Sequence, residues 1–168
     1  RIIYDDAERL SKLIDDLLDL SHIESGKMKF ALEECSLEAV VDKVLTGMDR
    51  EARKNSVTLK KEIPPRLARI KIDEAAIAQV LFNLAENAIK YNNAGGSVTI
   101  AARETDRGVE VSVTDTGIGI PQEDIPRIFE RFYRVDKARS RDLGGTGLGL
   151  SIVKHIIHAH HGEVMVES

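Results

Sequence analysis

The sequence predicts an α/β protein, a two-layer α/β sandwich with helices on one face of a mixed sheet, preceded by a long amphipathic helix. Two observations lead to this prediction. Apolar residues recur at helical spacing over residues 1–24 and over several later segments, whereas other segments alternate apolar and polar residues as strands do. These two kinds of segment interleave along the chain, which is typical of helices packed on a sheet.

The composition sets limits on partners and compartment. Charged residues make up 31% of the 168 residues and the formal net charge is −4, which argues against a nucleic-acid binder, since such proteins need a basic face. Cys35 is the single cysteine, so an internal disulfide is excluded and a cytoplasmic setting is expected. No apolar run approaches the roughly 20 residues of a membrane span, and we expect no membrane contact. The sequence begins without Met and reads as a fragment, whose parent could be anchored in the inner membrane.

Residues 1–24 predict a long helix with a hydrophobic seam. Apolar or small residues recur in alternating steps of four and three, as in a coiled coil. They are Ile3, Ala7, Leu10, Ile14, Leu17 and Ser21. Because no second long heptad helix follows, the expected partners are the same helix of another subunit and a helix outside this sequence. The alternative is a capping helix that lies on its own domain.

The remaining elements are short and closely spaced. Ser25 and Gly26 are expected to end the first helix. A strand is then expected over residues 27–33, and Ser36 is placed to cap a helix over residues 37–53. Further along, we expect strands over 57–63 and 69–72, a helix that Asp73 caps and that includes 79–92, a hairpin of strands 97–104 and 109–114, a helical stretch over 122–129, a helix over 148–159 and a last strand over 163–167.

The helix that includes residues 79–92 has an unusual polar face. Asn83 and Asn87 lie one turn apart there, although asparagine lowers helix propensity and adds no charge. An amide oxygen suits a Mg²⁺ ion that keeps several waters and takes its other ligands from phosphates. Asn87 could reach such an ion, and Lys90 would direct its ammonium at the same phosphates. The alternative is a solvated face with two indifferent asparagines.

Two glycine-rich loops follow this helix. Asp115 ends a strand and precedes Gly117 and Gly119, so the backbone can approach a ligand while one acid contacts it. A basic stretch over residues 131–141 leads to the glycine-rich residues 143–150, which predicts a mobile basic lid and a helix start able to meet a phosphate. Neither a P-loop nor a G-x-G-x-x-G fingerprint is present. Either loop alone could be a plain turn. Taken in order, however, the asparagine helix, the Asp115 loop, the basic stretch and the glycine-rich helix start provide a metal ligand, a group that recognises the base, a lid over the site and a binding site for phosphates.

These segments resemble sensor histidine kinases over nearly the whole chain. Residues 83–91 (NLAENAIKY) resemble the N box, 115–119 (DTGIG) the G1 box, 128–134 (IFERFYR) the F box, 145–150 (GTGLGL) the G2 box, and 17–26 (LLDLSHIESG) the end of the second helix of the dimerisation hairpin. The resemblance implies the Bergerat ATP-binding fold over residues 27–168, with residues 1–26 as that second helix. It also implies ATP and Mg²⁺ as ligands.

Site roles are carried over by position in these boxes. Asn87 would ligate Mg²⁺ with Asn83 beside it, and Lys90 would contact phosphate. Tyr91 would pack near the adenine, and Asp115 would accept a hydrogen bond from the adenine amino group, within a loop shaped by Gly117 and Gly119. The phosphates would be bracketed by Arg131 or Arg134 together with Gly145, Thr146, Gly147, Leu148 and Gly149. Phosphoryl transfer needs such positioning and charge neutralisation more than covalent help from the protein.

The resemblance further implies transfer of the ATP γ-phosphate to a histidine, relay to an aspartate of a response regulator receiver domain, and homodimerisation through the N-terminal helix. No histidine here stands in the family's S-H-E-L-R type of sequence; they are His22, His155, His158, His160 and His161. We therefore expect the acceptor to lie upstream, and this fragment not to phosphorylate itself. The last three could suggest a metal tract, but they end a helix, where cations are favoured.

One position distinguishes this chain from the ATP-hydrolysing relatives of the fold. Those relatives carry a Glu one turn before the metal Asn, where this chain has Asn83, so little ATP hydrolysis is expected. The rival interpretations are an ATP-hydrolysing relative, a non-catalytic module in which nucleotide binding only gates helix packing, and a structural helical adaptor without a ligand.

Overall fold

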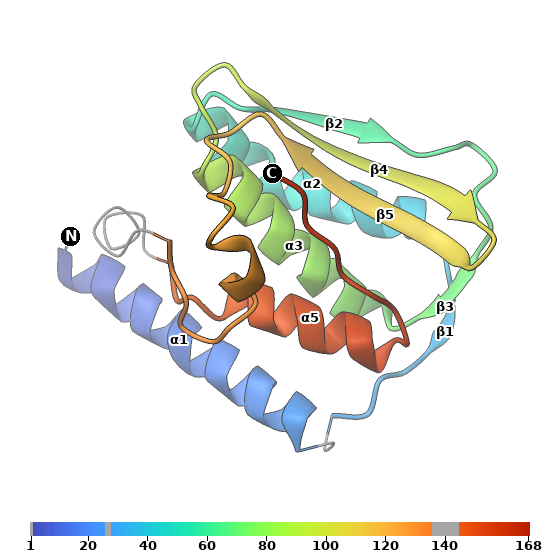
Figure 1. Ribbon diagram of the computed structural model, residues 1–168, viewed down its shortest axis with the longest axis horizontal. Coiled ribbons are helices and arrows are strands. Elements are labelled where there is room, and N and C mark those ends of the chain that lie inside the picture. The colour runs from blue at the N-terminus through green and yellow to red at the C-terminus, as the bar shows by residue number, and fades with distance from the viewer. Residues whose placement is uncertain (1, 26–27, 136–144) are drawn as a thin grey trace. The chain divides into compact units, whose positions relative to one another are not determined.

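The structure of the protein is a computed structural model, which describes residues 2–25, 28–135 and 145–168 (Figure 1). Its helices are α1 (Ile2–Glu24), α2 (Leu37–Lys54), α3 (Glu74–Lys90) and α5 (Gly149–Ala159), with a 3-10 turn η1 (Ile125–Arg127). Its strands are β1 (Glu33–Cys35), β2 (Thr58–Glu62), β3 (Ile70–Ile72), β4 (Ser97–Thr105) and β5 (Gly108–Asp115). The chain divides into two compact units, Phe30–Gly119 and Arg1–Lys29 with Ile120–Ser168.

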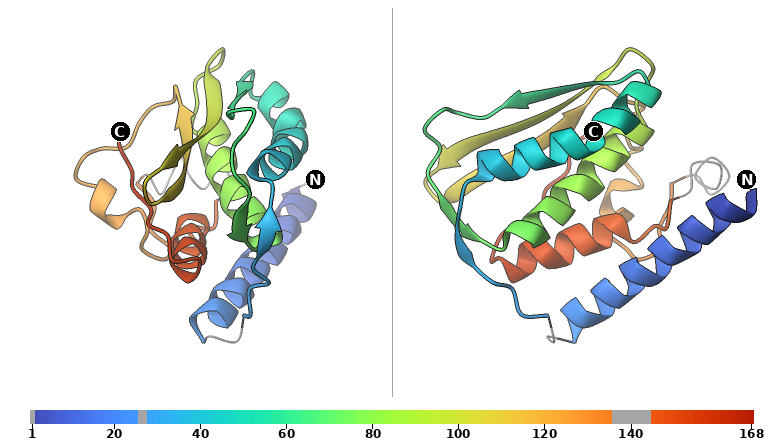
Figure 2. Two further views of the ribbon diagram at one scale, coloured as in Figure 1. Left: turned by 90° about the vertical axis from the view of Figure 1, so that its right-hand side faces the viewer. Right: turned by 180° about the vertical axis from the view of Figure 1, so that it is seen from behind.

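The unit Phe30–Gly119 contains the predicted mixed sheet. Its strand order is β2-β4-β5, with β2 parallel to β4 and β4 antiparallel to β5. Helices α2 and α3 pack on one face of this sheet (Figures 1 and 2). The buried core between helix and sheet is aliphatic and includes Ala88 and Ile89 of α3 and Val98 of β4, so the predicted two-layer α/β arrangement is confirmed.

Side-chain caps fix where the two long helices of this unit begin. The Ser36 side chain accepts a hydrogen bond from the Ala39 N–H at 3.4 Å, and Asp73 Oδ1 accepts one from the Ala76 N–H at 3.0 Å. Such caps satisfy N–H groups that the first helical turn leaves without partners. Both predicted caps are thus confirmed, and Asp73 sets the start of the helix that carries Asn83 and Asn87.

The predicted strand over residues 27–33 is wrong. Residues 28–32 are irregular, and β1 begins only at Glu33, where the antiparallel ladder with β3 starts. The backbone N–H of Ala31 donates instead to Asp73 Oδ2 at 2.9 Å. Alternation in the sequence was present, but a strand forms only where a partner strand accepts its backbone groups.

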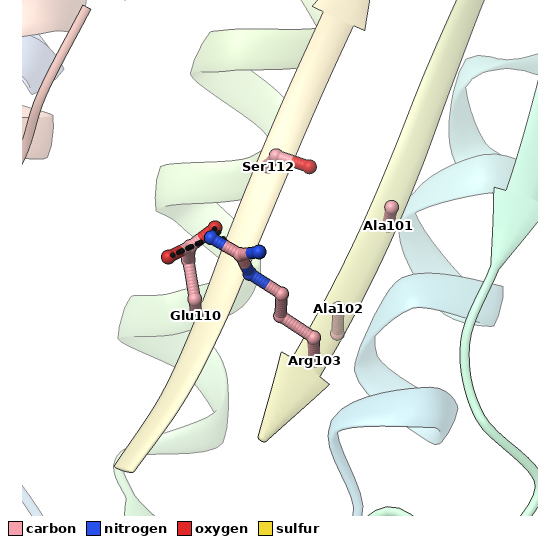
Figure 3. Close-up of a pocket in the computed structure, with 5 residues that line it drawn as sticks. All are labelled: Ala101, Ala102, Arg103, Glu110 and Ser112. Atoms are coloured by element: carbon pink, nitrogen blue, oxygen red, sulfur yellow. Dashed lines mark hydrogen bonds and ion pairs between the residues drawn. The ribbon is translucent and has the colours of Figure 1, made fainter. Parts of the chain in front are cut away.

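The other face of the sheet carries a cross-strand ion pair. Arg103 of β4 donates to Glu110 of β5 through Nε and Nη2, at 2.8 and 2.9 Å, beside a shallow hollow that Ala101, Ala102 and Ser112 help to line (Figure 3). The hydrogen bond from Arg103 lowers the pKa of the Glu110 carboxyl. None of the site residues predicted from the sequence lines this hollow, and the directly opposed charges support the hairpin.

In the second unit, α1 packs against α5. Leu20 of α1 and Ile152 and Ile156 of α5 are fully or nearly fully buried. Most of the predicted seam stays exposed: Leu10, Ile14 and Leu17 are 59%, 48% and 46% accessible. The side chain of Ile3, at the start of the seam, lies outside the described residues, as does Gly26. None of the described helices is long and apolar enough to cross a membrane.

Two further predicted elements in this unit are wrong. Residues 122–129 form consecutive turns and the short η1 instead of a helix, because Pro126 has no N–H to continue a helical ladder. Residues 163–167 form no strand. Their side chains alternate, with Met165 78% exposed and its neighbours half-buried, but the backbone has no ladder. The chain end is held by Ser168, whose Oγ accepts from the Ile120 N–H at 2.6 Å.

Candidate functional site

The polar face of α3 places two half-buried asparagines one turn apart. The Asn83 and Asn87 side chains make no hydrogen bond to any residue that the structure describes, although both belong to a helix fixed at its start by Asp73. Their amide groups therefore remain available to a ligand. Near the end of the same helix, Lys90 Nζ lies 5.8 Å from the centroid of the Tyr91 ring, which is within the range of a cation–π contact.

The loop that follows β5 is anchored on the end of α3. The backbone N–H of Ile118 donates to the Tyr91 carbonyl at 3.1 Å. A Cβ atom at Gly117 would lie 2.5 Å from that same carbonyl oxygen, a separation that real Cβ atoms do not show. The chain needs glycine at position 117 because the loop backbone passes this close to the helix end. Gly119 has a φ of 71°, in the left-handed region that favours glycine.

Within this loop, Asp115 is held by one of its two carboxylate oxygens. Its Oδ1 accepts a hydrogen bond from the Gly117 N–H at 2.7 Å. For Oδ2 there is no partner among the residues that the structure describes, and the side chain is exposed. The carboxylate is therefore oriented by its own loop while one oxygen remains available to accept a hydrogen bond from a ligand.

A second set of hydrogen bonds, not predicted from the sequence, joins the same two segments. Thr116 Oγ1 donates to Asn92 Oδ1 at 3.1 Å and accepts from the Ser97 N–H at 2.9 Å. Asn92 Nδ2 donates to the carbonyls of Ala88 and Ser97, at 3.1 Å each. Asn92 therefore links the end of α3 to β4 and to the loop that carries Asp115, which fixes the N box and the G1 box in one unit.

The other unit contains the F-box segment. Arg127 lies over the Tyr133 ring, with Cζ 4.3 Å from its centroid, and pairs with Glu130 at 3.1 Å. The Tyr133 hydroxyl donates a short hydrogen bond to Asp124, and this bond raises the pKa of the tyrosine above its ordinary value. These contacts hold the segment in place without helical structure.

The F-box and glycine-rich segments meet through their backbones. The Phe132 N–H donates to the Gly147 carbonyl at 2.9 Å. A Cβ atom at Gly147 would lie 2.9 Å from the Phe132 Cα, and Gly147 has a φ of 75°. Phe132 itself has a φ of 60°, which is uncommon for a bulky residue and marks local strain. The two predicted boxes are therefore in direct contact, through a junction that tolerates only glycine at position 147.

Arg134 has buried hydrogen-bond donors without partners. Its Nε and Nη2 atoms are buried and find no acceptor within the described part of the chain. A buried guanidinium with unmet donors is costly unless an anion or water supplies the missing acceptors. Arg134 therefore has the unmet donors that an anion could satisfy. Arg131, the alternative from the sequence, is exposed.

Helix α5 begins within the glycine-rich segment, at Gly149. The N-cap residue Leu148 makes no side-chain cap hydrogen bond within the described part of the chain, and Gly145, Thr146 and Gly147 before it are half-buried. The central part of the predicted lid, with Lys137, Arg139, Arg141, Leu143 and Gly144, lies outside the described residues. Among the residues that are described, no group of three or more His, Cys, Asp or Glu could hold a metal ion.

The predicted site residues thus fall into two internally connected sets. Asn83, Asn87, Lys90, Tyr91, Asp115, Gly117 and Gly119 belong to the unit Phe30–Gly119, and Arg131, Arg134, Gly145, Thr146, Gly147, Leu148 and Gly149 to the other. The sequence did not predict Asn92, Thr116 or, on α1, Asp16 as members. Thr116 lies inside the G1 box and Asn92 directly follows the N box, which was the signal for these two residues. The sequence holds no such signal for Asp16, which is 130 residues from Thr146.

Comparison with known proteins identifies the family of this chain. Residues 72–168 match the family described as histidine kinase-, DNA gyrase B-, and HSP90-like ATPase. The sensor histidine kinase WalK of Bacillus subtilis (strain 168) is 38% identical over 169 residues, which cover 99% of this chain and 28% of that protein. This chain therefore spans less than a third of the length of that relative.

Solved structures give the same result at the level of the fold. Full-length ShkA in complex with AMPPNP superposes with a TM-score of 0.78 at 30% identity, over 89% of this chain and 31% of that one. The catalytic domain of histidine kinase ThkA has a TM-score of 0.67 at 31% identity, over 79% and 82% of the two chains. ThkA in complex with the response regulator protein TrrA has a TM-score of 0.73 at 28% identity, over 96% and 43%.

Proposed function

Because the chain belongs to the family of histidine kinase-, DNA gyrase B- and HSP90-like ATPases, we propose that it is the ATP-binding catalytic portion of a sensor histidine kinase. Its reaction is transfer of the ATP γ-phosphate to a histidine of the parent protein upstream of this segment. From there the phosphoryl group passes to an aspartate of a response regulator receiver domain. The ThkA complex with TrrA supports the last step, as it pairs a related kinase with a response regulator.

The observation that carries this proposal is the junction between α3 and the Asp115 loop. Hydrogen bonds from Ile118 to Tyr91 and from Thr116 to Asn92 hold the loop on the end of the helix that bears Asn87. An amide ligand and a base-reading carboxylate serve one nucleotide only if their relative positions are fixed. In this unit, both belong to segments joined directly by these bonds.

The residues present fit a magnesium nucleotide on two counts. Arg134 has two buried donors that lack acceptors, as expected of a side chain that meets phosphate oxygens. Asn87 has an amide without a partner among the described residues, and one amide suffices for a Mg²⁺ whose other ligands are phosphates and water. When bound, Mg²⁺ would neutralise charge on the phosphates.

The chain's own residues then have the following tasks. Asp115 accepts a hydrogen bond from the adenine amino group, and Tyr91 packs near the ring. Lys90 and Arg131 or Arg134 neutralise the negative charge of the triphosphate. Gly145 and Gly147 before α5 and Gly149 at its first position carry no side chain, so the backbone N–H groups there can approach phosphate oxygens. None of these residues forms a covalent bond to the substrate, since phosphoryl transfer relies on positioning and charge stabilisation.

Helix α1 supports the homodimer that the resemblance implies. Leu10, Ile14, Leu17 and Leu18 are 46–59% exposed, although burial of each such side chain would be favourable by about 1.5–3 kcal/mol. We assign residues 1–26 to the dimerisation hairpin and residues 27–168 to the catalytic domain. The proposed location is cytoplasmic, in a parent protein that the inner membrane can anchor.

Phosphoryl transfer with labelled ATP tests the proposal. The 168-residue chain is incubated with γ-labelled ATP and Mg²⁺, alone and with a separate fragment of the parent that carries the histidine-bearing helix. We expect no label on the chain alone and label on the added fragment, which passes to a receiver domain. If the chain binds ATP but the added histidine is not labelled, the alternative of a nucleotide-responsive module without catalysis is favoured.

A second candidate is an ATPase like the gyrase and HSP90 relatives that the family also contains. Asn83 argues against it, because an amide cannot take a proton from water. Multiple-turnover hydrolysis measured by phosphate release separates the two candidates. We expect steady-state hydrolysis at background level, and rapid turnover would favour the ATPase.

A further inference from the structure

The loop before α5 is held by a carboxylate from α1. Thr146 Oγ1 donates a hydrogen bond to Asp16 Oδ2 at 2.8 Å, across 130 residues of sequence. Asp16 is only 8% exposed. An ionised side chain is seldom buried unless hydrogen-bonded partners compensate for lost hydration. Asp16 is thus a buried carboxyl group that accepts a hydrogen bond from the glycine-rich loop, in the unit that contains both elements.

The same threonine hydroxyl is bound to the backbone of the loop. The Leu148 N–H donates to Thr146 Oγ1 at 3.3 Å, and Leu148 is fully buried. A hydroxyl has one proton to donate and lone pairs that accept. Because the proton points to Asp16, the lone pairs are left to face Leu148. The carboxylate therefore fixes the Thr146 side chain, and through it the turn that leads into α5.

The loop is restrained from its other side as well. The Phe132 N–H binds the Gly147 carbonyl, and Gly147 has no room for a side chain against Phe132. Residues 146–148 are thus held between α1 and the F-box segment. If one of the two restraints is lost, the glycines are free to take other conformations, since glycine populates many backbone angles at little cost.

We infer that Asp16 is a positioning residue for nucleotide binding: through Thr146 it holds residues 146–148 in the conformation that receives the phosphates. The inference rests on the proposed function, because it requires that this loop meets a nucleotide. It also gives α1 a second role besides dimerisation. A displacement of α1 that removes the Asp16 carboxylate from Thr146 loosens the loop and weakens nucleotide binding.

Calorimetric titration of the 168-residue chain with Mg-ATP tests this inference. Asp16→Ala and Thr146→Val each remove the bond, and each should raise the Kd for ATP roughly tenfold, as expected for one hydrogen bond to a charged group. The double variant should lose no more than Asp16→Ala alone, because the bond that Thr146→Val removes is already absent there. Thr146→Ser keeps the donor and should recover most of the affinity lost in Thr146→Val. Asp15→Ala, which removes an exposed carboxylate from the next position of α1, is the matched control.

Amide hydrogen exchange of the nucleotide-free chain provides a readout that does not depend on ATP. The amides of Leu148 and Gly149 should exchange faster in Asp16→Ala and Thr146→Val than in the parent chain or in Asp15→Ala. The ratio of ATP to GTP affinity should not change, because the loop contacts phosphates and not the base. Thermal melts of all variants identify any loss of fold, and Thr146→Val leaves α1 itself intact.

The outcomes separate this inference from the proposed function. If the parent chain binds no ATP, the proposed function fails, whatever the exchange rates. If the parent chain binds ATP and the folded variants bind it equally well, the inference is overturned while the function stands. Independent, multiplying losses in the double variant would overturn it too. Tighter binding by Asp16→Ala would likewise contradict it, because the bond would then oppose nucleotide binding.

Discussion

Asp115→Asn changes one carboxylate oxygen of the proposed site and leaves the other in place. Oδ1 is bound to the Gly117 N–H at 2.7 Å, and asparagine can retain this bond through its own Oδ1. The second oxygen becomes an amide group that only donates. An adenine amino group, also a donor, would then face a donor, whereas the O6 acceptor of guanine would face a suitable partner.

The size of the effect follows from the loss of one hydrogen bond to a charged group. Such a bond contributes about 1.5–3 kcal/mol, so ATP affinity should fall roughly 10- to 150-fold at about 1.4 kcal/mol per factor of ten. GTP affinity should stay equal or rise, and the ratio of ATP to GTP affinity should fall by at least the same factor. The free energy of unfolding should change by less than about 0.5 kcal/mol, because the side chain is exposed and its bond to Gly117 is kept.

Calorimetric titrations with Mg-ATP and Mg-GTP measure both affinities, and urea unfolding measures stability. Asp106→Asn, in the exposed turn between β4 and β5, is the control for loss of one negative charge. The reasoning is refuted if Asp115→Asn lowers the affinities for ATP and GTP equally while the protein stays folded. Asp115 would then act through overall charge or loop shape and would not contact the base.

Three further predictions concern the metal, the loop and the dimer. Asn87→Ala should abolish the gain in ATP affinity that Mg²⁺ provides and leave the affinity in EDTA unchanged; calorimetry that finds the gain intact would place the metal ligand elsewhere. Gly117→Ala should lower the free energy of unfolding by about 1–3 kcal/mol, as is typical of an overpacked site, because the new Cβ would lie 2.5 Å from the Tyr91 carbonyl oxygen; an unchanged urea midpoint would contradict this. Leu17→Asp places a charge in the exposed seam of α1 and should weaken self-association, measured by sedimentation velocity at equal protein concentration. If the unmodified chain stays monomeric at all concentrations, the idea that this seam forms a dimer is contradicted.

Long periodic segments and caps could be predicted from the sequence because their causes are local. Ser36 and Asp73 each bind an N–H three residues further on, so cap and helix start lie within one short window. The β4–β5 hairpin also forms from neighbouring segments. The errors in the strands occur where a distant partner decides the outcome. Residues 28–32 alternate but have no strand beside them, and the real strand forms where β3 is available.

The candidate site divides in the same way. The glycine boxes and the asparagine face of α3 could be predicted because each lies within one short segment of the sequence. The links between them are not, since Thr116 and Asn92 are 24 residues apart and Asp16 and Thr146 are 130 apart. A lone Asn, Thr or Asp has many satisfactory environments, and only the fold selects which partner it meets.

The identity of residue 83 bears on which reaction the site can run. A hydrolytic site needs a group that takes a proton from water, and the Asn83 amide cannot do so at neutral pH. The half-buried Asn83 and Asn87 make no hydrogen bond to the described residues, so no neighbouring carboxylate is recruited through them to act as a base. The proposed site offers cationic and amide donors, which would lower the charge on a triphosphate and orient it. Such a site depends on an acceptor brought from outside it, and an imidazole nitrogen, which can attack without a separate base, meets that requirement better than water.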